Sequence, residues 1–107
     1  MNIKEVKVTE VGPRDGFQSE KTILKTEDKI DIINNLIEAG FPRIEVSSFV
    51  SPKAIPQLAD AESILSKVNR SSKTTLAALV PNSRGALRAV EAKLDQIVVF
   101  LSASESH

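Results

Sequence analysis

Residues 6–18 read VKVTEVGPRDGFQ, and this stretch sets the pattern for the whole chain. Its valine-rich first half predicts a β-strand. Pro13 and Gly16 bracket a tight turn directly after that strand, and the turn holds Arg14 and Asp15 side by side. Neighbouring opposite charges at a strand end can hold a cation and a developing anion within a few ångströms of each other. This is the outline of metal-assisted carbonyl chemistry.

Strand and helix signals alternate along the rest of the chain. Strands are predicted over residues 6–11, 43–47, 74–80 and 96–101, with one helix in each interval between them. The order β-α-β-α-β-α-β implies right-handed parallel crossovers. The last two strands are continuous apolar runs, so both of their faces are expected to be covered. Two α/β architectures fit: a small open doubly wound sheet, and the first half of an eight-stranded (β/α) barrel.

The predicted helices have recognisable ends. Thr26 is expected to cap the first helix at its N-terminus, and Gly40 is expected to end it. Asn82 or Ser83 can cap the third helix. Gly85 weakens that helix by about 1 kcal/mol relative to alanine.

The composition excludes several classes of protein. A length of 107 residues suits one domain. The 14 basic and 14 acidic side chains cancel, and no basic stripe is interleaved with aromatic residues, so nucleic acid is not an expected partner. The lack of cysteine excludes disulfides and thiolate chemistry from these residues. No apolar run can cross a bilayer, and the N-terminus lacks a signal-peptide core. We therefore expect a cytoplasmic protein that has no membrane partner.

Several blocks of the sequence resemble one enzyme family. Residues 10–20, EVGPRDGFQSE, resemble the first-strand motif of the 3-hydroxy-3-methylglutaryl-CoA lyases. These enzymes belong to a wider group of metal-dependent barrel lyases and synthases with an Arg-Asp-x-x-Gln signature. The SFVSPK segment points to the lyase branch, and Phe17 stands where the sibling synthases tend to have an acidic residue. The resemblance continues, in order, through residues 44–53, 55–60, 79–82 and 99–105.

The family resemblance implies a (β/α)₈ barrel, a fold that needs about 250 residues. Residues 1–107 are therefore expected to form the N-terminal half of a TIM-barrel lyase domain, ending after the fourth parallel strand. The implied reaction cleaves 3-hydroxy-3-methylglutaryl-CoA to acetoacetate and acetyl-CoA, a step of leucine degradation, with Mg²⁺ or Mn²⁺ as cofactor and an acyl-CoA as substrate. Two alternatives stay open: a chain that is non-catalytic as it stands and self-associates, and a sibling synthase that condenses acetyl-CoA with a 2-keto acid.

The resemblance also implies a role for individual residues. Arg14 is the catalytic and substrate-binding cation that meets negative charge on the thioester or ketone oxygen, and Asp15 is a metal ligand. Three further residues are expected to contact the substrate. Gln18 forms a hydrogen bond to the substrate or to metal-bound groups, Ser48 forms one to the substrate, and Glu45 orients the site. Taken from the residues alone, ordinary explanations are available, such as a turn aspartate or a surface ion pair.

Three further polar residues, His107, Ser47 and Asn82, lie in or near the matching blocks of sequence. His107 is the only histidine, and no metal role is expected for it, because the histidine ligands of the family come as a closely spaced pair on a late strand. Ser47 stays open as a second participant beside Ser48. The loop at Asn82 is expected to shape the side of the site where CoA enters.

Overall fold

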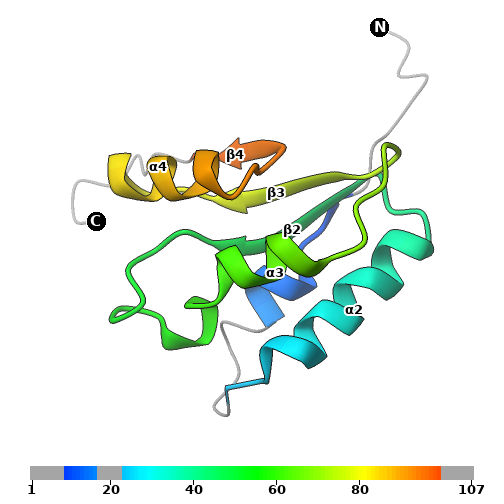
Figure 1. Ribbon diagram of the computed structural model, residues 1–107, viewed down its shortest axis with the longest axis horizontal. Coiled ribbons are helices and arrows are strands. Elements are labelled where there is room, and N and C mark those ends of the chain that lie inside the picture. Colours follow the sequence, from blue (N-terminus) through cyan, green and yellow to red (C-terminus); the bar gives the residue numbers. More distant parts are fainter. Residues whose placement is uncertain (1–8, 17–22, 100–107) are drawn as a thin grey trace, which may run out of the picture.

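The computed structural model of the chain describes residues 9–16 and 23–99 (Figure 1). All four strands are parallel, and they form one sheet in the order β1-β2-β3-β4. Helices or helical turns separate the strands, so the predicted alternation is confirmed. The elements in chain order are β1 (Thr9–Glu10), η1 (Gly12–Gly16), α2 (Thr26–Glu38), β2 (Arg43–Ser48), η2 (Pro56–Leu58), α3 (Ala61–Lys67), β3 (Thr75–Leu79), α4 (Ser83–Glu91) and β4 (Gln96–Val98).

The three α-helices pack against the same face of the sheet. The hydrophobic core joins apolar side chains of α2, α3 and α4 to alternate residues of two strands, namely Ile44, Val46, Leu76 and Ala78. A doubly wound sheet carries helices on both faces, so this one-sided arrangement excludes that alternative. The opposite face is the one that lines the interior of a closed barrel. The structure is therefore the α/β arrangement expected for the first half of a (β/α)₈ barrel.

The predicted strands agree with the structure to within a few residues. β2 is one residue longer than predicted, and β3 is one residue shorter at each end. Residues 6–8 of the predicted first strand and 100–101 of the predicted fourth strand lie outside the described residues.

The start of α2 differs from the prediction. Lys25 occupies the N-cap position instead of Thr26, and no side chain caps this helix. The Thr26 hydroxyl donates to Asp60 Oδ2 at 2.6 Å instead, and the buried Lys29 ammonium lies 2.9 Å from Asp60 Oδ1. These contacts tie α2 to the residue that precedes α3. A contact between helices has thus replaced the local capping bond that the sequence favoured.

Two other predicted helix ends are confirmed. Gly40 follows α2 with φ of +90°, a conformation that favours glycine. Asn82 caps α4, because its Oδ1 accepts a hydrogen bond from the Gly85 N–H at 2.8 Å. None of the described helices combines the length and the apolar character needed to span a bilayer.

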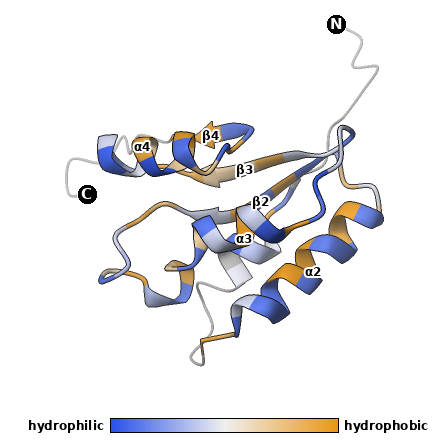
Figure 2. Cartoon of the chain, viewed as in Figure 1, coloured by the Kyte–Doolittle hydropathy of each residue, from blue (hydrophilic) through white to orange (hydrophobic). Residues whose placement is uncertain are grey.

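The expectation that both faces of the fourth strand are covered is wrong for the described residues. Figure 2 shows the end of β4 in the colour of apolar residues, yet Ile97 is 50% exposed, and Val99, directly after β4, is 63% exposed. Leu87 and Val90 of α4 are exposed as well. The physical reason is that β4 is an edge strand: among the described residues, it pairs with β3 alone.

Candidate functional site

An irregularity in β2 brings two predicted site residues to one face of the sheet. Glu45 pairs with Ala77 and Ser48 pairs with Leu79, although the register shifts between Glu45 and Ser47. Paired residues of neighbouring strands share a face, and Ala77 and Leu79 are two residues apart, so they point to the same side. Residues three apart in a regular strand would point to opposite sides. The bulge therefore places Glu45 and Ser48 together on the face away from the helices.

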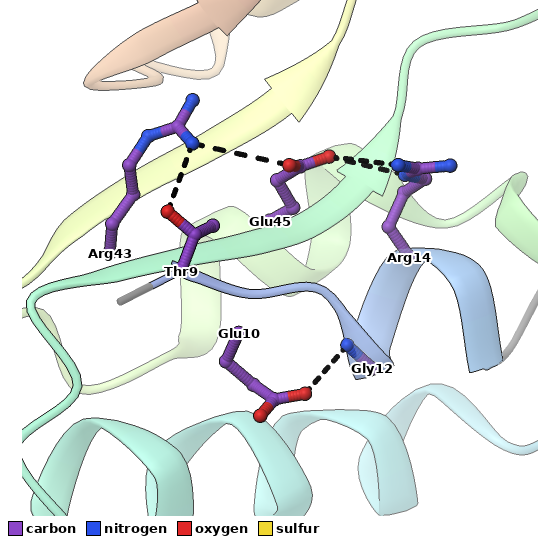
Figure 3. A network of polar contacts seen from close by, with 6 residues as sticks. All are labelled: Thr9, Glu10, Gly12, Arg14, Arg43 and Glu45. Carbon is purple, nitrogen blue, oxygen red and sulfur yellow. Dashed lines mark hydrogen bonds and ion pairs between the residues drawn. The ribbon is translucent and has the colours of Figure 1, made fainter. Parts of the chain in front are cut away.

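An ion pair connects the turn after β1 to the middle of β2. Arg14 lies in η1, and its Nε donates to Glu45 Oε1 at 3.2 Å (Figure 3). Arg14 Nη2 lies 3.2 Å from the same oxygen. The side chain of Glu45 is 9% exposed and that of Arg14 is 22% exposed, so water screens this pair less than it screens a surface pair. Two residues that the sequence singled out thus meet beside the carboxyl end of β1.

Arg43 belongs to the same cluster, and the sequence interpretation missed it. Its Nη1 lies 4.0 Å from Glu45 Oε2, so the carboxylate stands between two guanidinium groups. Arg43 Nη1 also donates to Thr9 Oγ1 at 3.2 Å, and Nε donates to Gln96 Oε1 at 2.5 Å. Arg43 is thus tied to β1 and to β4 from its own strand. The available signal was its position two residues before Glu45, which puts both side chains on one face.

The two serines of β2 point in different directions. Ser48 is buried and shares the face of Glu45. Ser47 pairs with Ala78, which belongs to the core covered by the helices. The Ser47 hydroxyl is fully buried, and no hydrogen-bond partner for it exists within residues 9–16 and 23–99. The structure therefore keeps Ser48 on the site face and turns Ser47 away from it.

Other residues from the sequence interpretation lie wholly or partly outside the described part of the chain. Phe17, Gln18 and His107 are not described, and only the backbone of Asp15, within η1, is described. That backbone follows the carboxyl end of β1, next to Arg14. The roles assigned to Asp15 and Gln18 stay predictions.

The described side chains do not by themselves form a metal site. Among them, no group of three or more Asp, Glu, His or Cys residues comes together. Glu45 stands between two arginines, whose positive charges oppose a further cation. Glu10 points to the opposite side of the sheet, where its Oε1 accepts a hydrogen bond from the Gly12 N–H at 2.8 Å (Figure 3). A divalent cation would therefore need other ligands, of which Asp15 is the predicted one.

Arg88 of α4 holds the segment that follows Ser48. Arg88 Nε and Nη2 donate to the two carboxylate oxygens of Glu62 at 2.7 and 2.8 Å, and Nη1 donates to the Val50 carbonyl at 3.1 Å. The guanidinium carbon lies 5.3 Å from the centroid of the Phe49 ring. The hydrogen bond from Arg88 lowers the pKa of Glu62, and Glu62 in turn raises the pKa of Arg88. These contacts fix the loop that begins beside the site.

A hollow of about 490 Å³ lies between this loop and the first turn of α4. Asn82 and Arg84 are part of its lining, and Arg14 and Glu45 are not. Asn82 therefore borders an opening near the carboxyl ends of β2 and β3. Its Oδ1 is already used to cap α4.

Comparisons with known proteins identify relatives over nearly the whole chain. The HMGL-like family model matches residues 5–107. The hydroxymethylglutaryl-CoA lyase of Bacillus subtilis is 49% identical over 104 residues, which are 97% of this chain and 35% of that protein. A 3-hydroxy-3-isohexenylglutaryl-CoA/hydroxymethylglutaryl-CoA lyase of Pseudomonas aeruginosa is 43% identical over 107 residues, which are 99% of this chain and 36% of that protein.

A comparison of structures agrees with this result. The structure of an HMG-CoA lyase from Acinetobacter baumannii, in complex with coenzyme A and 3-methylmalate, matches with a TM-score of 0.93 and 48% identity. The match covers 100% of this chain and 36% of that chain. The chain spans between 22% and 36% of the length of the curated relatives that it matches. From the shared four-stranded parallel architecture and the match over residues 5–107, we conclude that the chain belongs to the HMGL-like family.

Proposed function

We propose that this chain supplies the N-terminal half of the active site of an enzyme that cleaves 3-hydroxy-3-methylglutaryl-CoA to acetoacetate and acetyl-CoA. The observation that carries the proposal is the ion pair between Arg14 and the nearly buried Glu45. It holds a permanent positive charge in a fixed orientation beside the carboxyl end of β1. In (β/α)₈ barrels, active sites lie at the carboxyl ends of the strands.

The reaction is a retro-Claisen cleavage, and its charge movement defines what the site must provide. A base removes the proton of the tertiary hydroxyl group of the substrate. The oxygen then forms the ketone of acetoacetate while the adjacent carbon–carbon bond breaks. The electrons of that bond move into the thioester and give the enolate of acetyl-CoA, which is protonated at carbon. Negative charge therefore builds on the thioester oxygen, where a fixed cation stabilises the transition state most.

Arg14 is the residue that we assign to this developing charge. An arginine stays protonated throughout turnover, and its guanidinium presents its donors in a rigid plane. Glu45 holds Nε and Nη2 of Arg14 and so sets the orientation of that plane. Ser48 is on the same face, and we assign it a hydrogen bond to the substrate. Gln18 is assigned a hydrogen bond to the substrate or to metal-bound groups.

Further parts of the proposal rest on the resemblance rather than on described contacts. We retain Mg²⁺ or Mn²⁺ with Asp15 as one ligand, and such a cation would polarise substrate oxygens when bound. The role assigned to Arg14 does not depend on this cation, and the described side chains do not by themselves form a metal site. We also propose that the enzyme is cytoplasmic, acts on an acyl-CoA and forms a homo-oligomer. Neither nucleic acid nor a membrane is proposed as a partner.

A chimeric enzyme tests the proposed activity. In the chimera, this chain replaces the matching 35% of the B. subtilis lyase, and acetoacetate formation from 3-hydroxy-3-methylglutaryl-CoA is measured with Mg²⁺ or Mn²⁺ present. We expect turnover, and a loss of about 10² to 10³ in kcat for Arg14→Gln, because a charge aimed at the oxyanion is removed.

Arg70→Gln is the matched control for that substitution. Arg70 donates to the carbonyls of Lys93 and Ala92, on a part of the chain that contacts neither Arg14 nor Glu45 in any described interaction. A folded chimera that makes no acetoacetate, or an Arg14→Gln chimera with the original kcat, would contradict the proposal.

The other readings of the sequence have distinct outcomes. The 107-residue chain alone is expected to be inactive. Its described residues fix the guanidinium of Arg14 in place, but they do not form a complete metal site. Acetoacetate formation by the purified chain would refute this expectation. Condensation of acetyl-CoA with a 2-keto acid, in place of cleavage, would identify a sibling synthase.

A further inference from the structure

We propose that Arg43 is a positioning residue for Arg14 and acts through Glu45. The inference rests on the proposed function, because it concerns the cation assigned to the reaction. The Glu45 carboxylate has Arg14 at Oε1, with two nitrogens at 3.2 Å, and Arg43 near Oε2, at 4.0 Å (Figure 3). Each guanidinium thus approaches a different oxygen of the same carboxylate.

Arg43 has a fixed position before any substrate binds. Its side chain is 27% exposed, and it donates to Thr9 Oγ1 of β1 and to Gln96 Oε1 of β4. A long side chain normally loses conformational entropy when it is ordered. Here two hydrogen bonds to neighbouring strands offset that cost. The two neighbouring strands therefore hold the positive charge of Arg43 in place beside Glu45.

Arg43 has two physical effects on Glu45. A nearly buried carboxylate is costly unless cations or donors surround it, and Arg43 supplies the second of two cations. Its charge near Oε2 also restricts rotation of the carboxylate, so Oε1 stays directed at Arg14. The neighbour of Glu45 on β3 is Ala77, which provides no polar group for this purpose. Without Arg43, the carboxylate can turn, and the guanidinium of Arg14 loses its fixed plane.

This loss should appear in the rate and not in substrate affinity. A small displacement of a catalytic group reduces the rate strongly, because the reaction depends on alignment in the transition state. In the chimera described above, we expect Arg43→Met to lower kcat about fivefold to tenfold while KM changes less than about twofold. Arg43→Lys keeps the charge and should restore part of kcat. Arg70→Met, the control, should leave kcat unchanged.

A double-mutant cycle separates positioning from a general structural effect. If Arg43 acts through Glu45, then Arg43→Met should have no further effect on kcat in a Glu45→Gln background. An equal fold loss in both backgrounds would overturn the inference, and so would an unchanged kcat in the single variant. Thr9→Val removes only one hydrogen bond from Arg43. It should show the same pattern with a smaller loss, and it replaces Arg43→Met if that variant does not fold.

A second measurement does not depend on turnover. The Nε–H proton of Arg14 donates to Glu45, so its NMR signal should exchange slowly with water. We expect exchange to become about tenfold faster in Arg43→Met and to stay slow in Arg70→Met. Equal exchange in the original and the Arg43→Met protein overturns the inference, even where the chimera is active. An inactive chimera in which Arg43 still protects Arg14 contradicts only the proposed function and supports the positioning role.

Discussion

Replacing Gly85 by alanine sets two effects of opposite sign against each other. Alanine in a helix is about 1 kcal/mol more favourable than glycine, so the sequence alone predicts a more stable protein. In the structure, a Cβ atom at this position would lie 2.5 Å from the Phe49 carbonyl oxygen and 3.4 Å from Phe49 Cβ. The Phe49 N–H also donates to the Leu79 carbonyl at 2.8 Å, which anchors this backbone to β3. The obstacle is therefore a fixed main-chain atom.

The size of the effect follows from this contact. A carbon and an oxygen without a bond between them rest more than 3 Å apart, so α4 must shift away from the loop after β2 by several tenths of an ångström or more. Overpacking of this kind costs about 1–3 kcal/mol. The same shift would lengthen the hydrogen bond from Arg88 to Val50. After the gain of about 1 kcal/mol in helix propensity is subtracted, we expect Gly85→Ala to lower the free energy of unfolding by up to about 2 kcal/mol.

Urea unfolding followed by circular dichroism measures this difference. Arg84→Ala is the control, because Arg84 is an exposed neighbour in the same helix and its replacement should change stability by less than about 0.5 kcal/mol. A Gly85→Ala protein that is about 1 kcal/mol more stable than the original would refute the reasoning, because helix propensity alone would then be acting.

The remaining predictions concern the serines, an ion pair and the metal. Ser47→Ala should leave kcat unchanged and should not lower the melting temperature, because no described residue bonds to the hydroxyl that it removes. Ser48→Ala should lower kcat about threefold to tenfold. Equal effects of the two variants on kcat would contradict the assignment of the two serines to opposite faces of the sheet. In urea unfolding, Glu62→Gln should lower the free energy of unfolding by about 0.5 kcal/mol at pH 7, and this cost should shrink as the pH is lowered. The pKa of Glu62 is lowered by Arg88, so the contribution is complete above the unfolded-state pKa and disappears as the pH falls through the folded-state pKa; a cost that does not depend on pH would show that the charge is not responsible. Asp15→Asn in the chimera should weaken Mn²⁺ binding measured by calorimetry, and unchanged affinity would remove Asp15 from the ligand set.

The order of strands and helices could be predicted because its signals act over a few residues. Gly40 ends α2 through its own conformation, and Asn82 caps α4 through a bond to Gly85. The shared face of Glu45 and Ser48 could not be predicted in this way. Alternation along a regular strand puts residues three apart on opposite faces, and nothing in the sequence marks the bulge. The family resemblance, and not the alternation of the strand, predicts that Glu45 and Ser48 belong to one site.

The contacts that the sequence interpretation missed join residues far apart in the chain. Thr26 looks like a helix cap from its neighbours, but its hydroxyl bonds to Asp60. Arg43 is an unremarkable strand residue until the register brings it next to Thr9 and Gln96. Such contacts depend on how the strands are ordered and aligned, which local propensities do not contain.

The cluster around Glu45 is better explained by geometry than by stability. A buried carboxylate and its cations lose much of their attraction to the cost of removing them from water, and apolar residues of similar size often stabilise a fold as well or better. The other face of the same sheet is packed with apolar residues instead, and Ile44 and Val46 of β2 lie in its core. Within residues 9–16 and 23–99, the face away from the helices is the one that keeps a buried anion with an arginine on each side. An arrangement that adds little stability, placed where the proposed reaction needs a fixed cation, is what selection for catalysis would retain.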